Sequence, residues 1–243
     1  MRLSIDGRTV RLKAHMCCLD GTLPGNTVRA LRRCVAAGVE AMEIDVWAGR
    51  TAGFPVAHDE PRGGEPELAA MLAGLRGPGI LQIDLKDEAP LPAHRLDALA
   101  DLLRPCAPSL IVSGGSGANV RAVGERVHGL RLGYDPLLRF DLRRGRYVGA
   151  LAQLHLDHEG VFEQLWADAP FASIWYLRAT LLSRLADEGF DAVAWLAARG
   201  AEVDAWTIDV PDEPLLRRVA ALGVAQITTN TPLAWLTRPG RSG

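Results

Sequence analysis

The sequence has few aromatic residues and no excess of positive charge. Phe, Trp and Tyr make up 6% of the 243 residues, and 27 Lys and Arg residues face 29 Asp and Glu residues, which gives a net charge of −2. The basic residues are scattered along the chain, so the electrostatic footprint of a nucleic-acid-binding protein is missing. We therefore expect no nucleic-acid partner.

Long apolar runs are also missing. No uninterrupted apolar stretch approaches the roughly 20 residues that a membrane-spanning helix needs, so we expect no stable membrane insertion. The first thirteen residues carry several charges in place of the apolar segment of a signal peptide, which favours a cytoplasmic protein. The four cysteines lack zinc-type spacing, and Cys17 and Cys18 are adjacent, so reduced thiols are the favoured interpretation.

What the chain does have is apolar content of 48%, arranged as strand-like runs that alternate with helical segments. The predicted strands are Arg11–Cys17, Ala41–Trp47, Gly53–His58, Ile80–Lys86, Ser109–Ser113, Leu130–Tyr134, Ala172–Leu177, Glu202–Asp209 and Ala225–Thr229. The predicted helices are Val28–Ala37, Glu65–Leu75, His94–Leu103, Asn119–Val127, Leu181–Arg199 and Glu213–Leu222, followed by a last short helix. Residues 139–160 lack periodicity and are predicted as a long loop with a short inserted element, and only the tail over 238–243 is expected to be disordered.

This βα order fits either a closed barrel or an open doubly wound sheet. Polar residues follow several early strands, and a barrel gathers such side chains around one axis, whereas an open sheet spreads them into a row. The segment Ser113–Gly117 lacks the Lys-Ser/Thr ending of a phosphate loop, so we predict a βα turn, with phosphate contact through backbone amides as the weaker alternative. We predict an α/β fold of the TIM (β/α)8 barrel type, with a single domain over residues 1–243. The sequence does not encode the oligomeric state visibly.

Three acids stand on the expected strands. Glu43 and Asp45 are two residues apart and project from the same side of an extended chain, which favours a shared cation. Asp84 follows after another βα-sized interval, with Lys86 on the same face. A structural ion-pair network of Glu43 and Asp45 with Lys86 and Arg50 is the alternative, but burying three acids without a cation is costly.

These residues resemble the glycerophosphodiester phosphodiesterase family. The matching segments are His15 with its following residues, Pro24-Gly-Asn-Thr27, Glu43-Ile-Asp45, His58-Asp59, Asp84-Leu-Lys86 and Ala205-Trp-Thr207. Their order and spacing agree across nearly the whole chain. The resemblance implies a TIM barrel in which two histidines act as acid and base and three acids bind a divalent cation, Ca²⁺ or Mg²⁺.

Carried over by position, the resemblance assigns a role to eight residues of this chain. The implied catalytic residues are His15 and His58, the implied metal ligands are Glu43, Asp45 and Asp84, and the implied substrate contacts are Lys86, Asn26 and Trp206. The implied reaction is metal-dependent hydrolysis of a glycerophosphodiester, or a related small phosphodiester, to a phosphomonoester and an alcohol. The resemblance also suggests that the substrate's own hydroxyl attacks first, giving a cyclic phosphate that water then opens.

The chain departs from the family pattern at four positions around the expected pocket. Met16 replaces an arginine that would clamp the phosphate, and Gly25 replaces a glutamate before Asn26. Asp84 replaces a glutamate, and Asn230 replaces an aspartate often found there. Met16 and Gly25 motivate a second hypothesis, a barrel that has lost catalysis and binds a phosphorylated ligand or a partner protein. A third and weaker interpretation is a lyase that releases a cyclic phosphate without hydrolysing it.

Several residues keep a second interpretation. His58 can be a strand-end cap, Lys86 can pair with neighbouring acids, and Trp206 can pack the barrel mouth instead of binding substrate. A catalytic thiol at Cys17 or Cys18 is a minor alternative. The other histidines are expected to lie on the surface, and a second metal site is a disfavoured interpretation of the segment His155–His158.

Overall fold

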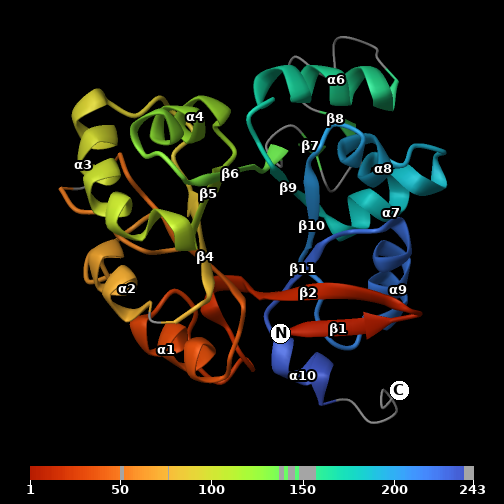
Figure 1. The fold of residues 1–243 in the computed structure, drawn as a ribbon, viewed down its shortest axis with the longest axis horizontal. Coiled ribbons are helices and arrows are strands. Elements are labelled where there is room, and N and C mark those ends of the chain that lie inside the picture. Colours follow the sequence, from red (N-terminus) through yellow and green to blue (C-terminus); the bar gives the residue numbers. More distant parts are fainter. Residues whose placement is uncertain (50–51, 76, 137–139, 142–145, 148–156, 238–243) are drawn as a thin grey trace.

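The chain forms a closed barrel of parallel strands surrounded by helices (Figure 1). The computed structural model describes residues 1–49, 52–75, 77–136, 140–141, 146–147 and 157–237. In these residues the eight barrel strands are β2 (Arg8–Ala14), β3 (Ala41–Val46), β4 (Ile80–Leu85), β5 (Leu110–Gly114), β6 (Arg131–Tyr134), β9 (Ile174–Arg178), β10 (Glu202–Trp206) and β11 (Gln226–Thr229). The predicted TIM (β/α)8 barrel is therefore confirmed.

Closure of the barrel comes from the pairing of β2 with strands on both sides. The sheet runs in the order β2-β11-β10-β9-β6-β5-β4-β3, and β3 then pairs with β2 through Lys13 opposite Ala41 and Ala14 opposite Met42. All of these pairings are parallel, so the carboxyl ends of the strands meet at one mouth of the barrel.

Helices surround the barrel, as Figure 1 shows, with α1 to α4 along one side and α6 to α9 along the other. The α-helices are α1 (Val28–Ala36), α2 (Leu68–Gly74), α3 (Ala93–Leu103), α4 (Gly117–Arg126), α6 (His158–Asp168), α7 (Ala179–Asp187), α8 (Ala192–Ala197), α9 (Glu213–Leu222) and α10 (Pro232–Leu236), and the 3-10 helices are η1 (His15–Cys17) and η2 (Arg104–Ser109). Their apolar faces pack on the outside of the strands in two large clusters of buried side chains, one under α1 to α4 and one under α6 to α9. Since the barrel's outer face holds most of the apolar core, its inner face is free to carry polar side chains.

The predicted strand Gly53–His58 is wrong. In this segment Pro55 and Val56 make only isolated antiparallel bridges, with Glu67 and Val46 respectively. The chain doubles back along the end of β3, where the amide of Trp47 donates to the carbonyl of Pro55. The apolar segment Gly53–His58 is thus a loop that runs beside the end of β3, and it places His58 at the mouth of the barrel.

Two other local predictions need correction. The single helix expected over Leu181–Arg199 is two helices, α7 and α8, because Gly189 adopts a positive φ of 89° and Asp191 caps the next helix by accepting from the amide of Ala194. The strand β1 (Arg2–Ile5) was not predicted, and it pairs antiparallel with the first half of β2.

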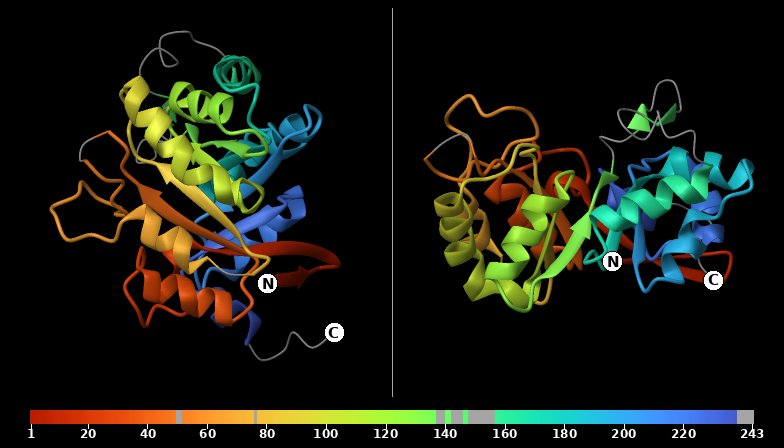
Figure 2. Two further views of the ribbon diagram at one scale, coloured as in Figure 1. Left: turned by 60° about the vertical axis from the view of Figure 1, so that its left-hand side comes forward. Right: turned by 90° about the horizontal axis from the view of Figure 1, so that it is seen from above.

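The region over 139–160 is only partly described. Its described part contains the antiparallel pair β7 (Phe140–Asp141) and β8 (Arg146–Tyr147), so the inserted short element is present, and Figure 2 shows this pair projecting from the body of the barrel. The tail over 238–243 and His155 lie outside the described residues. Within the described ranges, no helix combines the length and the apolar character needed to span a bilayer.

Candidate active site

Three carboxylates meet at the carboxyl ends of β3 and β4. Glu43 and Asp45 project inward from β3, and Asp45 stands opposite Asp84 in the β3–β4 register. One oxygen from each of the three side chains lies within 4.8 Å of the others. Glu43 and Asp45 are buried, with 4% and 2% of their surfaces exposed, and Asp84 is half-buried. The structure therefore brings together the three acids that the sequence pattern selected.

This acidic cluster has the chemistry of a hard-cation site. Burial, followed by the nearby carboxylates of Asp45 and Asp84, raises the pKa of Glu43 well above its ordinary value. A cation bound by these oxygens would relieve that repulsion, and Ca²⁺ and Mg²⁺ both take oxygen ligands of this type. The three acids thus fit a divalent cation and could hold one.

Lys86 lies against the same acids. Its ammonium is 3.1 Å from Oδ1 of Asp45 and 3.3 Å from Oδ2 of Asp84. Burial lowers the pKa of Lys86, but the two carboxylates outweigh burial and raise it above its ordinary value. The alternative pairing with neighbouring acids after β4 is not seen, since Asp87 accepts from the amides of Ala48 and Gly49. The expected partner Arg50 lies outside the described residues.

His15 follows β2 directly, and its ring is hydrogen-bonded to Asn230, the residue after β11. Its Nδ1 lies 2.8 Å from Oδ1 of Asn230, and Nδ2 of Asn230 donates to Oδ2 of Asp209 at 2.7 Å. A carboxylate only accepts, so the amide oxygen of Asn230 must face His15, and Nδ1 of His15 must carry the hydrogen. The other ring nitrogen, Nε2, lies 3.9 Å from Oε2 of Glu43. Burial lowers the pKa of His15, which favours a neutral ring with its basic nitrogen toward the acids.

His58 approaches the same pocket from the loop after β3. Its side chain is 59% exposed, and its Nδ1 lies 2.9 Å from Oδ1 of Asp59. It lines one pocket of about 120 Å³ together with His15, the three acids, Lys86 and Trp206. The two histidines thus enter the pocket differently: His15 is half-buried and held by Asn230, and His58 lies on the rim beside a carboxylate.

The loop between β2 and α1 carries two departures from the family pattern, and its geometry explains the one at Gly25. Met16 has a positive φ of 50°, and its backbone amide donates to Oε2 of Glu43 at 2.7 Å. A Cβ atom at Gly25 would lie 2.6 Å from Cβ of Met16, so this loop leaves no room for a side chain there. The next residue, Asn26, accepts from the amide of Asp45 and donates to its carboxylate at 2.8 Å. Asn26 therefore contacts a predicted metal ligand, and its direct contact with substrate stays a prediction.

Trp206 stands at the end of β10 and lines the pocket half-buried. Its Nε1 is buried and has no hydrogen-bond partner in the described part of the protein. The guanidinium of Arg178 lies 5.9 Å from the centre of a Trp206 ring. Both earlier interpretations of Trp206, packing and substrate contact, are compatible with this position.

Sequence reasoning missed a second polar layer deeper in the barrel. Its side chains are those of Lys13, Gln82, Ser113, Asp204, Gln226 and Thr228, each no more than 4% exposed. A period-two signal was present for some of them, because Lys13 lies two residues before His15 and Gln82 two residues before Asp84. Nothing local in the sequence indicated which of these groups would meet.

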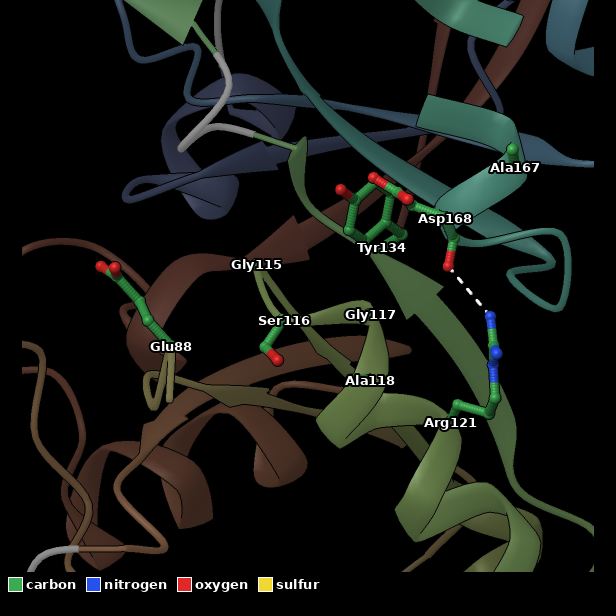
Figure 3. A pocket seen from close by; sticks show the side chains of 9 residues that line it. All are labelled: Glu88, Gly115, Ser116, Gly117, Ala118, Arg121, Tyr134, Ala167 and Asp168. Carbon is green, nitrogen blue, oxygen red and sulfur yellow. Dashed lines mark hydrogen bonds between the residues drawn. The ribbon is translucent and has the colours of Figure 1, made fainter. Parts of the chain in front are cut away.

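A second pocket, of about 600 Å³, lies beside the start of α4 (Figure 3). The predicted βα turn is confirmed, since only Gly115 and Ser116 separate β5 from α4. The hydroxyl of Ser116 caps α4 by accepting from the amide of Asn119, and Figure 3 shows Arg121 bonded to the backbone carbonyl of Asp168 across the pocket. These polar groups are engaged with the protein itself.

The remaining candidates take structural positions. His158 does not join a second metal site, because its two nitrogens bond Tyr147 and Glu188 at 2.7 Å each. Burial raises the pKa of both Cys17 and Cys18 above the ordinary value, so neither sulfur is an activated thiolate.

The fold and the residues at the mouth of the barrel define a TIM barrel with a candidate cation site. No family model and no curated protein matches the sequence. Solved structures do match: a glycerophosphodiester phosphodiesterase from Parabacteroides distasonis is 16% identical, with 93% of this chain and 95% of that chain covered and a TM-score of 0.69. One from Thermotoga maritima is 15% identical, with coverage of 91% and 94% and a TM-score of 0.64.

A third solved structure is an Oleispira antarctica phosphodiesterase in complex with the product sn-glycerol-3-phosphate. It is 16% identical, with 93% of this chain and 95% of that chain covered and a TM-score of 0.63. Likeness at these identities shows that the chain shares its fold with these phosphodiesterases.

Proposed function

We propose that the protein is a metal-dependent phosphodiesterase, formed by a single domain over residues 1–243, that hydrolyses a glycerophosphodiester or a related small phosphodiester. The observation that carries the proposal is the meeting of three oxygen ligands, Glu43, Asp45 and Asp84, with two histidines around one pocket. The shared fold with glycerophosphodiester phosphodiesterases supports it. A bound divalent cation would neutralise the phosphodiester charge and polarise its oxygens.

The two histidines take different roles in this proposal. His15 is the general base, because burial favours its neutral ring and the bond from Nδ1 to Asn230 leaves Nε2 as the unprotonated nitrogen at the pocket. His58 is the general acid, because it lies on the exposed rim of the same pocket, with its Nδ1 2.9 Å from Oδ1 of Asp59. His15 removes a proton from the substrate's attacking hydroxyl, and His58 gives a proton to the leaving alkoxide as the cyclic phosphate forms. Water then adds to the cyclic phosphate and opens it to the phosphomonoester.

The remaining predicted residues position the substrate or the site. Lys86 supplies the positive charge nearest the acids, so it contacts the phosphate in place of the arginine missing at Met16. Trp206 contacts the substrate from the pocket lining. Asn26 contributes by holding the carboxylate of Asp45.

The test is turnover of a panel of glycerophosphodiesters, measured as released alcohol, with Ca²⁺, with Mg²⁺ and with chelator. His15→Ala and His58→Ala should each lower kcat by at least about 100-fold. His94→Ala, on the outer helix α3, is the matched control and should keep the wild-type rate. Unchanged turnover in either active-site variant would show that the assigned mechanism is wrong.

One alternative function is favoured by Met16. A pocket without the phosphate-clamping arginine fits a barrel that binds a phosphorylated ligand without turning it over. Ligand binding with no product from any diester, even with metal supplied, would support that alternative. Hydrolysis of any diester would rule it out.

A further inference from the structure

A buried ion pair lies directly below the acidic cluster. Nζ of Lys13 is 2.9 Å from Oδ2 of Asp204, and the two residues are 2% and 0% exposed. Of the 27 basic residues in the chain, only Lys13 and Lys86 are lysines, and both line the acidic pocket. Burying two charges costs free energy that their attraction seldom exceeds, so stability alone does not explain this pair.

A directed chain of hydrogen bonds leads from Lys13 toward the cation site. The ammonium of Lys13 donates to Oε1 of Gln82. Because an ammonium only donates, this bond fixes the amide of Gln82 with its nitrogen pointing the other way. Nε2 of Gln82 then donates to Oγ of Ser113 at 2.8 Å.

Ser113 completes the chain at a predicted metal ligand. Its hydroxyl donates to Oδ1 of Asp84 at 2.9 Å. Ser113 is fully buried and stands opposite Asp84 in the β4–β5 register, so the hydroxyl has little freedom to turn elsewhere. With one oxygen of Asp84 engaged by Ser113, the other, Oδ2, is directed toward Lys86 at 3.3 Å.

We propose that Lys13, Gln82 and Ser113 are positioning residues that hold the carboxylate of Asp84 in the orientation that completes the cation site. Asp204 pairs with Lys13 at the start of this hydrogen-bond chain, and it accepts a hydrogen bond from the hydroxyl of Thr228 at 2.6 Å. The inference rests on the proposed function, because it requires a cation at the three acids. It assigns the buried layer to the support of the metal ligands, in the way that outer groups orient ligands at other metal centres.

The test is the affinity of the metal-free protein for Ca²⁺ and Mg²⁺, measured by titration calorimetry without substrate. Ser113→Ala removes the hydroxyl and should weaken cation binding about 10- to 100-fold. Ser173→Ala is the matched control, since its hydroxyl bonds the carbonyl of Leu132 away from the acids. This control should bind the cation as the wild type does, and it should unfold at the wild-type temperature in chelator.

A second variant interrupts the hydrogen-bond chain one residue earlier, at Gln82. Gln82→Met is similar in volume and leaves Ser113 without its incoming donor, so it should also weaken cation binding. The double variant should bind no more weakly than the weaker single variant, because both substitutions interrupt one chain. Gln82→Met also provides the measurement if Ser113→Ala fails to fold.

Two outcomes overturn the proposal and are distinguishable. Wild-type affinity in both Ser113→Ala and Gln82→Met would show that the chain does not position Asp84, and it would leave the proposed function intact. No cation binding by the wild type itself would overturn both this inference and the proposed function.

Discussion

Nδ1 of His15 lies 2.8 Å from Oδ1 of Asn230. The amide of Asn230 is oriented in turn, because it donates from Nδ2 to Asp209 at 2.7 Å and its backbone amide donates to the same carboxylate. This arrangement selects the tautomer of His15 that places a basic nitrogen at the pocket. The departure from aspartate at position 230 therefore keeps an acceptor for the histidine without adding a charge beside Asp209.

Replacing this acceptor should impair catalysis. Asn230→Leu keeps the approximate shape but frees His15 to adopt the other tautomer, so kcat should fall on the order of 100-fold. Nitrogen NMR of the imidazole checks the cause directly, because the hydrogen should leave Nδ1 in the variant. Asn230→Asp retains an acceptor and should keep kcat within about tenfold of the wild type. An unchanged tautomer and rate in Asn230→Leu would contradict the assignment.

Cation binding should stabilise the fold. Ca²⁺ or Mg²⁺ at about 100 times its Kd should add about 2.7 kcal/mol to the free energy of unfolding, and should raise the Tm by about 5–10 °C. Asp45→Asn removes a ligand charge and should abolish this shift. Asp87→Asn is the control, because Asp87 is a buried acid that binds backbone amides outside the cluster. A shift of equal size in Asp45→Asn would place the cation elsewhere.

Lys86 should oppose cation binding while it supports turnover. Its ammonium contacts Asp45 and Asp84, so Lys86→Met should tighten cation binding at least about tenfold and lower turnover. In chelator the same variant should lose about 2 kcal/mol of stability, because the acids lose their counter-charge. Lys86→Arg keeps the charge and should bind the cation as weakly as the wild type. Weaker cation binding in Lys86→Met would contradict this interpretation.

The loop before α1 should tolerate no side chain at position 25. Gly25→Ala places a Cβ atom 2.6 Å from Cβ of Met16 and should lower the free energy of unfolding by about 1–3 kcal/mol, measured by denaturant titration. Gly74→Ala is the control: its nearest contact is 3.3 Å and it lies in α2, where alanine is the better helix former. A Gly25→Ala variant as stable as the wild type would show that the loop relaxes freely.

The sequence was sufficient to predict the barrel because its signals are local. Period-two alternation placed Glu43 and Asp45 on one face, and the parallel pairing of β3 with β4 then brought Asp84 beside them. The catalytic assignments of His15 and His58 came from the family resemblance, and they stay predictions. The apolar run over Gly53–His58 misled because a loop that returns along a strand end carries the same short pattern as a strand.

The buried layer could not be predicted for a different reason. Lys13 and Asp204 lie on strands at opposite ends of the sequence, and no local pattern pairs them. Which inward-facing groups meet depends on the register of the closed barrel, in which β2 contacts β11 and β10 lies one strand further. The glycine at position 25, where the family pattern has a glutamate, is likewise explained only by the three-dimensional contact with Met16, which no sequence pattern indicates.

The most direct test of the proposed activity is phosphorus NMR of the wild type with glycerophosphocholine, with Ca²⁺, with Mg²⁺ and with chelator. We predict that the diester signal is replaced by that of a phosphomonoester when metal is present, and that His15→Ala abolishes the change. A cyclic phosphate as the only final product would make the protein a lyase. An unchanged diester signal for this substrate and for every other diester tested would contradict the proposed hydrolysis.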